Sequence, residues 1–202
     1  MVFFSKSHLY PFHWEHVINA FWNKYPNDLQ FHVRRVDIIN FDFDEKNKIL
    51  YTKRLFSLKY NSPKLLERII GSNLTGIATE ETMCNFNKRK LIANGSNYSF
   101  NNIFSIRETC TFTPSNENSE STLYTQDITF KLFQRKNKFK WINKLFENAV
   151  IQSFNEKSLS GIKAMYIQID KIKSLLNHEN KVKKSIYESP SFFIPNCLYK
   201  KI

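Results

Sequence analysis

The fold class follows from the stretch TLYTQDITFKLFQRKNKFKWINKLFENAV, residues 122–150, because the spacing of its apolar residues changes within it. Over residues 122–133 apolar and polar residues alternate, as they do along a half-buried strand. After the basic turn at residues 135–140, apolar residues recur every three or four positions, as they do on a helix. One face of the strand carries Tyr124, Ile128, Phe130 and Leu132.

The helical spacing continues to about residue 176 and predicts one long C-terminal helix over residues 141–176. Gly161 is expected to bend or divide this helix. Residues 179–202 are rich in lysine and aperiodic, which predicts a basic tail after a domain of residues 1–178. The apolar helix positions include Ile142, Leu145, Phe146, Ala149, Ile162, Met165, Tyr166, Ile169, Ile172 and Leu176.

Upstream, further strands are predicted at residues 2–8, 31–43, 49–60, 76–87, 89–100 and 103–114. One face of strand 49–60 carries Leu50, Thr52, Arg54, Phe56, Leu58 and Tyr60, and one face of strand 103–114 carries Phe104, Ile106, Cys110 and Phe112. Consecutive strands with short turns form antiparallel sheets, and helices segregated at the ends give an α+β fold. We therefore expect a curved antiparallel sheet of about six or seven strands, gripped by the long helix and enclosing an apolar cavity.

A second helix is predicted in HWEHVINAFWNKYPN, residues 13–27. Its apolar stripe consists of Trp14, Val17, Ile18, Phe21 and Trp22. Pro11 suits the first turn of this helix, and Pro26 prevents its continuation past about Lys24. A short amphipathic helix is predicted at SPKLLERIIG, residues 62–71, between two strands.

Composition limits the class of partner. The formal net charge of +12 favours a polyanion, either nucleic acid or an anionic membrane surface. Three scattered cysteines are too few for a disulfide framework or a zinc site, so we expect no metal. No apolar run is long enough for a transmembrane helix, and the N-terminus lacks a secretory-signal pattern. We expect a soluble protein that reaches membranes by its surface.

Five stretches in order resemble the PRELI/slowmo family of mitochondrial phospholipid-transfer proteins, also called the PRELI/MSF1 domain family. They are WEHVINAFWNKYPN (14–27), HVRRVDII (32–39), KRLFSLKYNSPKLLERIIG (53–71), YSFNNIFSIRETCTF (98–112) and GIKAMYIQIDKI (161–172). Together they span nearly all of residues 1–176. The middle and C-terminal stretches are more similar to the slowmo branch than to the PRELI branch.

The resemblance implies a lipid shuttle of the mitochondrial intermembrane space with no enzymatic activity and no cofactor. Its cargo would be a bound anionic phospholipid, either phosphatidic acid or, in the slowmo branch, phosphatidylserine. Its partners would be the mitochondrial membrane surface and a small disulfide-bonded helical protein, with no role for nucleic acid. A closed apolar cavity suits such a cargo, because exposing two acyl chains to water costs about 20 kcal/mol or more.

The resemblance also implies a lipid headgroup site. Lys24 lies where the family has a basic residue facing the phosphate, and His32 coincides with a histidine of the PRELI branch, although a structural histidine is an equal alternative. Lys59 lies beside a basic position of the family that here falls on Leu58, and strand alternation puts neighbours on opposite faces. Lys157 stands one turn from Ser153 and Ser160, which occupy the columns of two family lysines.

The predicted lid over the cavity mouth is formed by Leu65, Leu66, Ile69 and Ile70, with a packed surface helix as the alternative.

Three other functional classes remain open. A basic nucleic-acid-binding protein would explain the charge, although no known binding motif is present. An enzyme is disfavoured because no catalytic motif occurs. An assembly protein could keep the fold without transferring a lipid.

Overall fold

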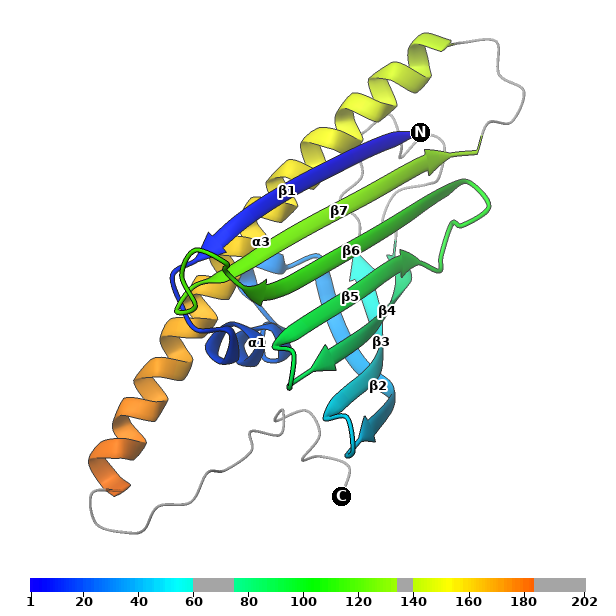
Figure 1. Cartoon of the computed structure of the whole chain (residues 1–202). Coiled ribbons are helices and arrows are strands. Elements are labelled where there is room, and N and C mark those ends of the chain that lie inside the picture. Colours follow the sequence, from blue (N-terminus) through cyan, green and yellow to red (C-terminus); the bar gives the residue numbers. More distant parts are fainter. Residues whose placement is uncertain (60–74, 134–139, 184–202) are drawn as a thin grey trace.

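The computed structural model describes residues 1–59, 75–133 and 140–183. The strands of the fold are β1 (Val2–Tyr10), β2 (Val33–Asp44), β3 (Ile49–Lys59), β4 (Thr75–Asn85), β5 (Lys90–Asn97), β6 (Phe104–Pro114) and β7 (Thr122–Leu132). The helices are α1 (Trp14–Trp22), the short 3-10 helix η1 (Asp28–Gln30) and α3 (Lys140–Lys183). All seven strands join one antiparallel sheet, as predicted (Figure 1). The order of the strands in this sheet is β1-β7-β6-β5-β4-β3-β2.

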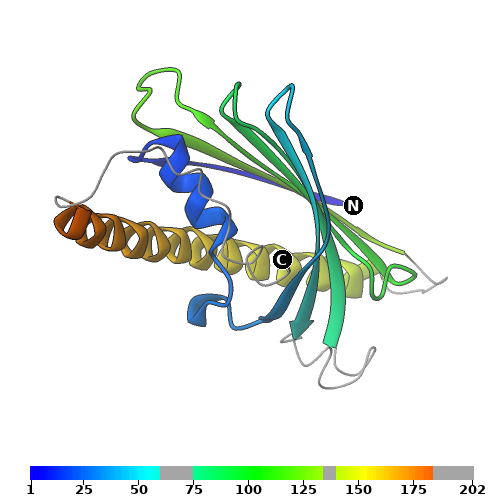
Figure 2. The same ribbon diagram turned by 90° about the horizontal axis from the view of Figure 1, so that it is seen from below.

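The sheet order requires one long crossing of the chain. From β2 to β7 each strand pairs with the next, but β1 pairs with β7, with Val2 opposite Phe130 and Tyr10 opposite Thr122. The chain must therefore pass from one edge of the sheet to the other after β1, and α1 and η1 lie on this crossing. Figure 2 shows that α1 and α3 both lie on the concave side of the curved sheet.

The main core lies between α1, α3 and this concave face. Trp14 is buried and its indole Nε1 donates a hydrogen bond to the carbonyl oxygen of Phe112 in β6 at 3.1 Å. The Phe21 and Phe112 rings are 5.5 Å apart between centroids. Each fully buried side chain of this size contributes about 1.5–3 kcal/mol. The predicted apolar stripe of α1 is buried throughout: Trp14, Val17, Ile18, Phe21 and Trp22.

Helix α1 is shorter than predicted at both ends. Pro11 precedes the helix instead of occupying its first turn, and Lys24 follows the helix instead of ending it. Asn23 is the C-cap residue: its backbone N–H makes the last helical hydrogen bond to the Asn19 carbonyl oxygen at 3.2 Å, and its side-chain Nδ2 donates to the same oxygen at 2.9 Å. The helix thus ends at Trp22, ahead of Pro26, with the Asn19 carbonyl satisfied twice.

Helix α3 runs unbroken through Gly161, so the predicted bend or division there is wrong. A single glycine costs a helix only about 1 kcal/mol, and buried Ile162, Met165 and Ile169 hold the helix just beyond it. The helix also continues past the predicted end at residue 176 into the segment assigned to the tail. The rest of that segment, residues 184–202, lies outside the described residues.

Burial along β3 and β7 follows the predicted alternation. In β3 the predicted inner positions Leu50, Thr52, Arg54 and Phe56 are all buried. The short helix predicted at residues 62–71 lies outside the described residues, so it stays a prediction. None of the helices in the described ranges is long and apolar enough to cross a bilayer.

Candidate functional site

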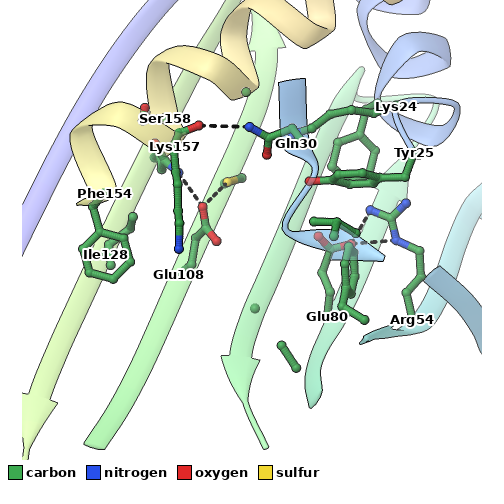
Figure 3. Close-up of a pocket in the computed structure, with 18 of the residues that line it drawn as sticks. Lys24, Tyr25, Gln30, Arg54, Glu80, Glu108, Ile128, Phe154, Lys157 and Ser158 are labelled. Carbon is green, nitrogen blue, oxygen red and sulfur yellow. Dashed lines mark hydrogen bonds and ion pairs between the residues drawn. The ribbon is translucent and has the colours of Figure 1, made fainter. Parts of the chain in front are cut away.

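A cavity of about 220 Å³ lies between the concave face of the sheet and α3. Strands β3 to β7 form its floor, the segment after α1 forms one wall, and residues 154–165 of α3 form its cover. Figure 3 shows polar side chains from the helix and from the strands meeting in this space. The site therefore depends on segments that lie far apart in the sequence.

Much of the cavity lining is apolar. Apolar side chains of the lining come from three elements: Phe56 and Leu58 from β3, Ile128 from β7, and Phe154 and Met165 from α3. A smaller apolar cluster around Phe104 and Phe130 continues beside Phe154. The predicted cavity is thus present, and its lining also carries five charged side chains. Lys24 and Lys157 were predicted there, whereas Arg54, Glu80 and Glu108 were not.

Lys24 is one of these charged residues. It lies in the turn after α1, and its Nζ is 5.1 Å from the centroid of the Tyr25 ring. Burial lowers the pKa of the Lys24 ammonium, but Tyr25, Cys110 and Glu108 together raise it by more, so the net shift is upward. Lys24 therefore carries a positive charge inside the cavity, at the position where the sequence predicts a headgroup contact.

Lys157 reaches the same cavity from α3. Burial lowers the pKa of its ammonium, and the nearby carboxylate of Glu108 partly offsets this effect. The backbone of this turn is held by η1, because Gln30 Nε2 donates to the Lys157 carbonyl oxygen at 3.3 Å and to Ser160 Oγ at 2.5 Å. Of the two predicted serine columns, Ser160 thus has a structural role, and the turn brings Lys157 toward Lys24.

His32 also lines the cavity, but as a neutral group. Burial, followed by the positive charges of Lys157 and Lys24, lowers the pKa of its imidazole to about 4. At neutral pH the ring can exchange hydrogen bonds with a ligand but cannot supply a charge. Of the predicted headgroup residues, the structure therefore brings Lys24, His32 and Lys157 together.

The fourth predicted headgroup residue, Lys59, does not line the cavity, whereas its neighbour Leu58 does. Successive residues of a strand face opposite sides of the sheet, and β3 pairs regularly with β4 up to Lys59 opposite Thr75. A headgroup contact by Lys59 therefore lacks support from the geometry. The predicted lid residues Leu65, Leu66, Ile69 and Ile70 lie outside the described residues.

Arg54 and Glu80 form a buried ion pair in the cavity floor, with Arg54 Nε donating to Glu80 Oε1 at 2.8 Å (Figure 3). The remaining acidic lining residue is Glu108, whose Oε1 accepts hydrogen bonds from Gln126 Nε2 at 2.5 Å and from the Cys110 thiol at 3.5 Å. Among the described lining residues, three are cationic and two are anionic. With His32 neutral, the cavity carries one net positive charge.

Arg54, Glu80, Glu108 and Gln126 line the cavity but were not predicted as site residues. For Glu108 and Gln126 the sequence did contain a signal. The inward face of β6 has apolar or cysteine residues at every position from 104 to 112 except Glu108, and that of β7 is apolar from 124 to 132 except at Gln126. A polar residue that interrupts an otherwise buried face needs a partner. These two interruptions partner each other.

The described residues contain no cluster of histidine, cysteine or acidic groups suited to a metal ion. Residues 15–175 match the sequence model of the PRELI-like family. The chain belongs to the PRELI-like family. The family that the five sequence stretches predicted is thus confirmed. Individual proteins of other organisms are similar to this PRELI-like protein as well.

"Protein UPS2, mitochondrial" of Saccharomyces cerevisiae is 28% identical to the PRELI-like protein over 162 residues, covering 80% of this chain and 69% of the relative. A UPS-like protein of Schizosaccharomyces pombe is 27% identical over 175 residues, covering 85% and 91%. The slowmo homologue of Dictyostelium discoideum is 29% identical over 128 residues, covering 63% and 56%. A slowmo protein is thus among the relatives.

Solved structures share the fold of the PRELI-like protein. The Thermus thermophilus protein TTHA0849 superposes with a TM-score of 0.53 at 13% identity, covering 85% of this chain and 99% of that one. The Zhui aromatase/cyclase of Streptomyces has a TM-score of 0.50 at 9% identity, covering 84% and 94%. At such low identity the comparison establishes the fold alone, and this fold serves at least one enzyme.

Proposed function

We propose that this protein is a carrier that takes one anionic glycerophospholipid, phosphatidylserine or phosphatidic acid, from one mitochondrial membrane to another. The main support is the cavity under α3, which combines an apolar lining with the ammonium groups of Lys24 and Lys157. An apolar wall suits acyl chains, and buried cations suit a phosphate. The name of the UPS2 relative supports a mitochondrial location.

A carrier of this kind needs no chemical step. Moving a diacyl lipid through water exposes on the order of 30 methylene groups at about 0.8 kcal/mol each. Sheltering these groups in a protein lowers that barrier without making or breaking a bond. We therefore propose a non-enzymatic role, in which the phospholipid is cargo and not cofactor.

The resemblance to the PRELI/slowmo family adds two proposals about context. The protein would act in the intermembrane space, and it would bind a small disulfide-bonded helical protein there while docking on the membrane surface. Native mass spectrometry of the complex purified from mitochondria tests both the cargo and the partner. A mass matching the chain plus one phospholipid is expected, and a lipid-free chain that also takes up no lipid from vesicles would contradict the proposal.

Transfer between vesicles tests the role of the cavity. We expect Lys24→Glu to lower the transfer rate of an anionic phospholipid at least about tenfold, because reversing the charge repels the phosphate in a partly buried site. Lys88→Glu makes the same change on an exposed turn and should transfer like the wild type. Circular dichroism and the melting temperature check that both variants fold. Equal transfer by the two variants would remove Lys24 from the headgroup site.

A further inference from the structure

Glu108 and Gln126 are the two polar interruptions of the inward faces of β6 and β7, and they meet in the cavity floor. The Gln126 amide uses its Nε2 to donate to Glu108 Oε1. This orientation follows from the chemistry, because a carboxylate can only accept from the amide nitrogen. The Gln126 amide oxygen must then point away from Glu108.

That amide oxygen has no hydrogen-bond partner among the described residues, although Gln126 is only 7% exposed. Ser158 of α3, only 6% exposed and also in the cavity lining, likewise has an unpartnered hydroxyl. Buried polar groups are normally satisfied, so unpaired acceptors in a cavity indicate a site for a ligand that donates hydrogen bonds.

Charge indicates what kind of donor this is. Glu108 interacts electrostatically with both Lys24 and Lys157, which are the candidate phosphate ligands. A carboxylate beside a phosphate site repels a bare phosphate, unless the ligand also brings a positive charge. A headgroup that carries an ammonium next to its phosphate can pair its phosphate with Lys24 and Lys157 and its ammonium with Glu108.

The net charge of the cavity agrees with such a headgroup. The described lining carries one net positive charge from Lys24, Arg54 and Lys157 against Glu80 and Glu108. A phosphatidylserine headgroup has two negative charges and one positive charge, so it would neutralise the cavity with every charge paired. Phosphatidic acid has no cation to offer Glu108.

We propose that Glu108 and Gln126 form an ammonium subsite beside the phosphate site, which makes the protein prefer phospholipids with an amine headgroup over phosphatidic acid. This inference rests on the proposed lipid-carrier function. The Glu108 carboxylate pairs with the ammonium, and the Gln126 amide oxygen accepts one of its N–H bonds. Ser158 lies on the opposite wall, where its hydroxyl can bond to the headgroup from α3.

The test measures which lipid the folded protein selects. The wild type is incubated with phosphatidylcholine vesicles containing equal fractions of phosphatidylserine, phosphatidylethanolamine, phosphatidylglycerol and phosphatidic acid, and native mass spectrometry reads the bound lipid. The Glu108→Gln variant keeps the size and removes the charge. We expect its ratio of amine lipids to phosphatidic acid to fall roughly tenfold or more, as the loss of a charged hydrogen bond predicts.

Two further variants sharpen the test. Gln126→Met removes the acceptor at similar size and should shift the ratio in the same direction. Glu81→Gln, on the same sheet but with a side chain 65% exposed, makes the same chemical change outside the cavity and should leave the ratio unchanged. Because the bound lipid is read only on folded protein, loss of stability does not mimic loss of selectivity.

The outcomes separate the two proposals. A wild type that binds none of the four lipids contradicts the carrier function itself. A wild type that binds lipid while Glu108→Gln keeps the same ratio overturns the ammonium subsite alone, and shows that Glu108 serves only to balance the lysines. If Glu108→Gln lost phosphatidylserine but kept phosphatidylethanolamine, the ammonium subsite would also be overturned, because both headgroups carry the ammonium. A wild type that preferred phosphatidylglycerol over both amine lipids would overturn the ammonium subsite as well. The phosphatidylglycerol headgroup has hydroxyl donors but no cation.

Discussion

Gly161 of α3 lies where the helix meets the turn after α1. A methyl group added at this position would lie 3.7 Å from Lys24 Nζ and 3.8 Å from Gln30 Nε2, both ordinary van der Waals distances. Position 161 therefore has room for the methyl group of an alanine beside Lys24 and Gln30. Neither close packing nor a bend in the helix requires a glycine here.

Gly161→Ala should raise the free energy of unfolding by about 0.5–1 kcal/mol, because alanine favours the helix and the added methyl fits. Urea denaturation measures this change. Gly161→Leu provides the contrast: its larger side chain would press on Lys24 and Gln30, so it should lower both stability and lipid transfer. A destabilised alanine variant would contradict this account of the packing.

Arg54 shows how one charged residue is kept inside an apolar layer. Its guanidinium carbon lies 4.7, 5.1 and 5.4 Å from the ring centroids of Phe21, Trp22 and Phe56. Glu80 on the neighbouring strand completes the enclosure through an ion pair. The cluster joins α1 to β3 and β4, so it links the helix to the sheet where a purely apolar contact would not fix the orientation.

Strand β4 offers a matched pair of acidic residues to test this ion pair. Glu80→Gln should lower the free energy of unfolding by about 3 kcal/mol, because it leaves the buried Arg54 charge without its counter-charge. Glu81→Gln breaks the exposed Lys53–Glu81 pair, which is 2.8 Å long, and should cost about 0.5 kcal/mol or less.

A second substitution shows whether the unpaired charge is the cause. Arg54→Met added to Glu80→Gln should recover part of the lost stability, since it removes the unpaired cation. Urea denaturation of the single and double variants measures the coupling between the two positions. Similar losses at positions 80 and 81 would mean that the buried pair contributes little.

The acid stability of the whole protein depends on His32. The pKa of its imidazole is about 4 in the folded chain, against an ordinary value of 6.5. Between these values the unfolded chain binds more protons than the folded chain, so stability falls as the pH falls. Burial lowers the pKa of His8 and His16 as well, which adds to the loss with the same sign.

His32 alone should account for up to about 3 kcal/mol of lost stability between pH 6.5 and pH 4. Chemical denaturation at a series of pH values measures this, and His32→Asn should have a shallower slope by about one proton in that range. An unchanged slope in the variant would show that His32 is not buried as a neutral group.

The net charge of +12 predicts how the whole chain meets a membrane. Each lysine or arginine near an anionic surface contributes about 1 kcal/mol, and salt screens this attraction. Sedimentation with vesicles should therefore show stronger binding to anionic vesicles than to neutral ones, and weaker binding at high salt. Binding that ignores both lipid charge and salt would exclude electrostatic docking.

The periodicity of apolar residues allowed most of the fold to be predicted. The strands, the stripe of α1 and the long helix α3 were all correct in kind, because burial of one face leaves a repeat of two or of 3.6 residues in the sequence. The errors concern the two ends of α1, the C-terminal end of α3 and its continuity at Gly161. Each depends on particular contacts, such as Asn23 with Asn19, that periodicity does not record.

The candidate site was predictable only in part. Sequence and resemblance pointed to Lys24, His32 and Lys157, which do line the cavity, and to Lys59, which does not. Arg54, Glu80, Glu108 and Gln126 were missed, although each interrupts or neighbours a buried strand face. A polar residue on such a face signals that a partner exists, but not which residue the partner is.

The sequence alone determined the order of strands and helices along the chain, their buried faces and the membership of the PRELI-like family. These properties arise from the local spacing of apolar residues and from motifs that can be read along the chain. Which charges share the cavity depended on folding. Lys24 follows the first helix, Glu108 and Gln126 lie in separate strands, and Lys157 lies in the last helix. These residues meet because the sheet curves under α3, and pairing across such distances leaves no periodic trace in the sequence.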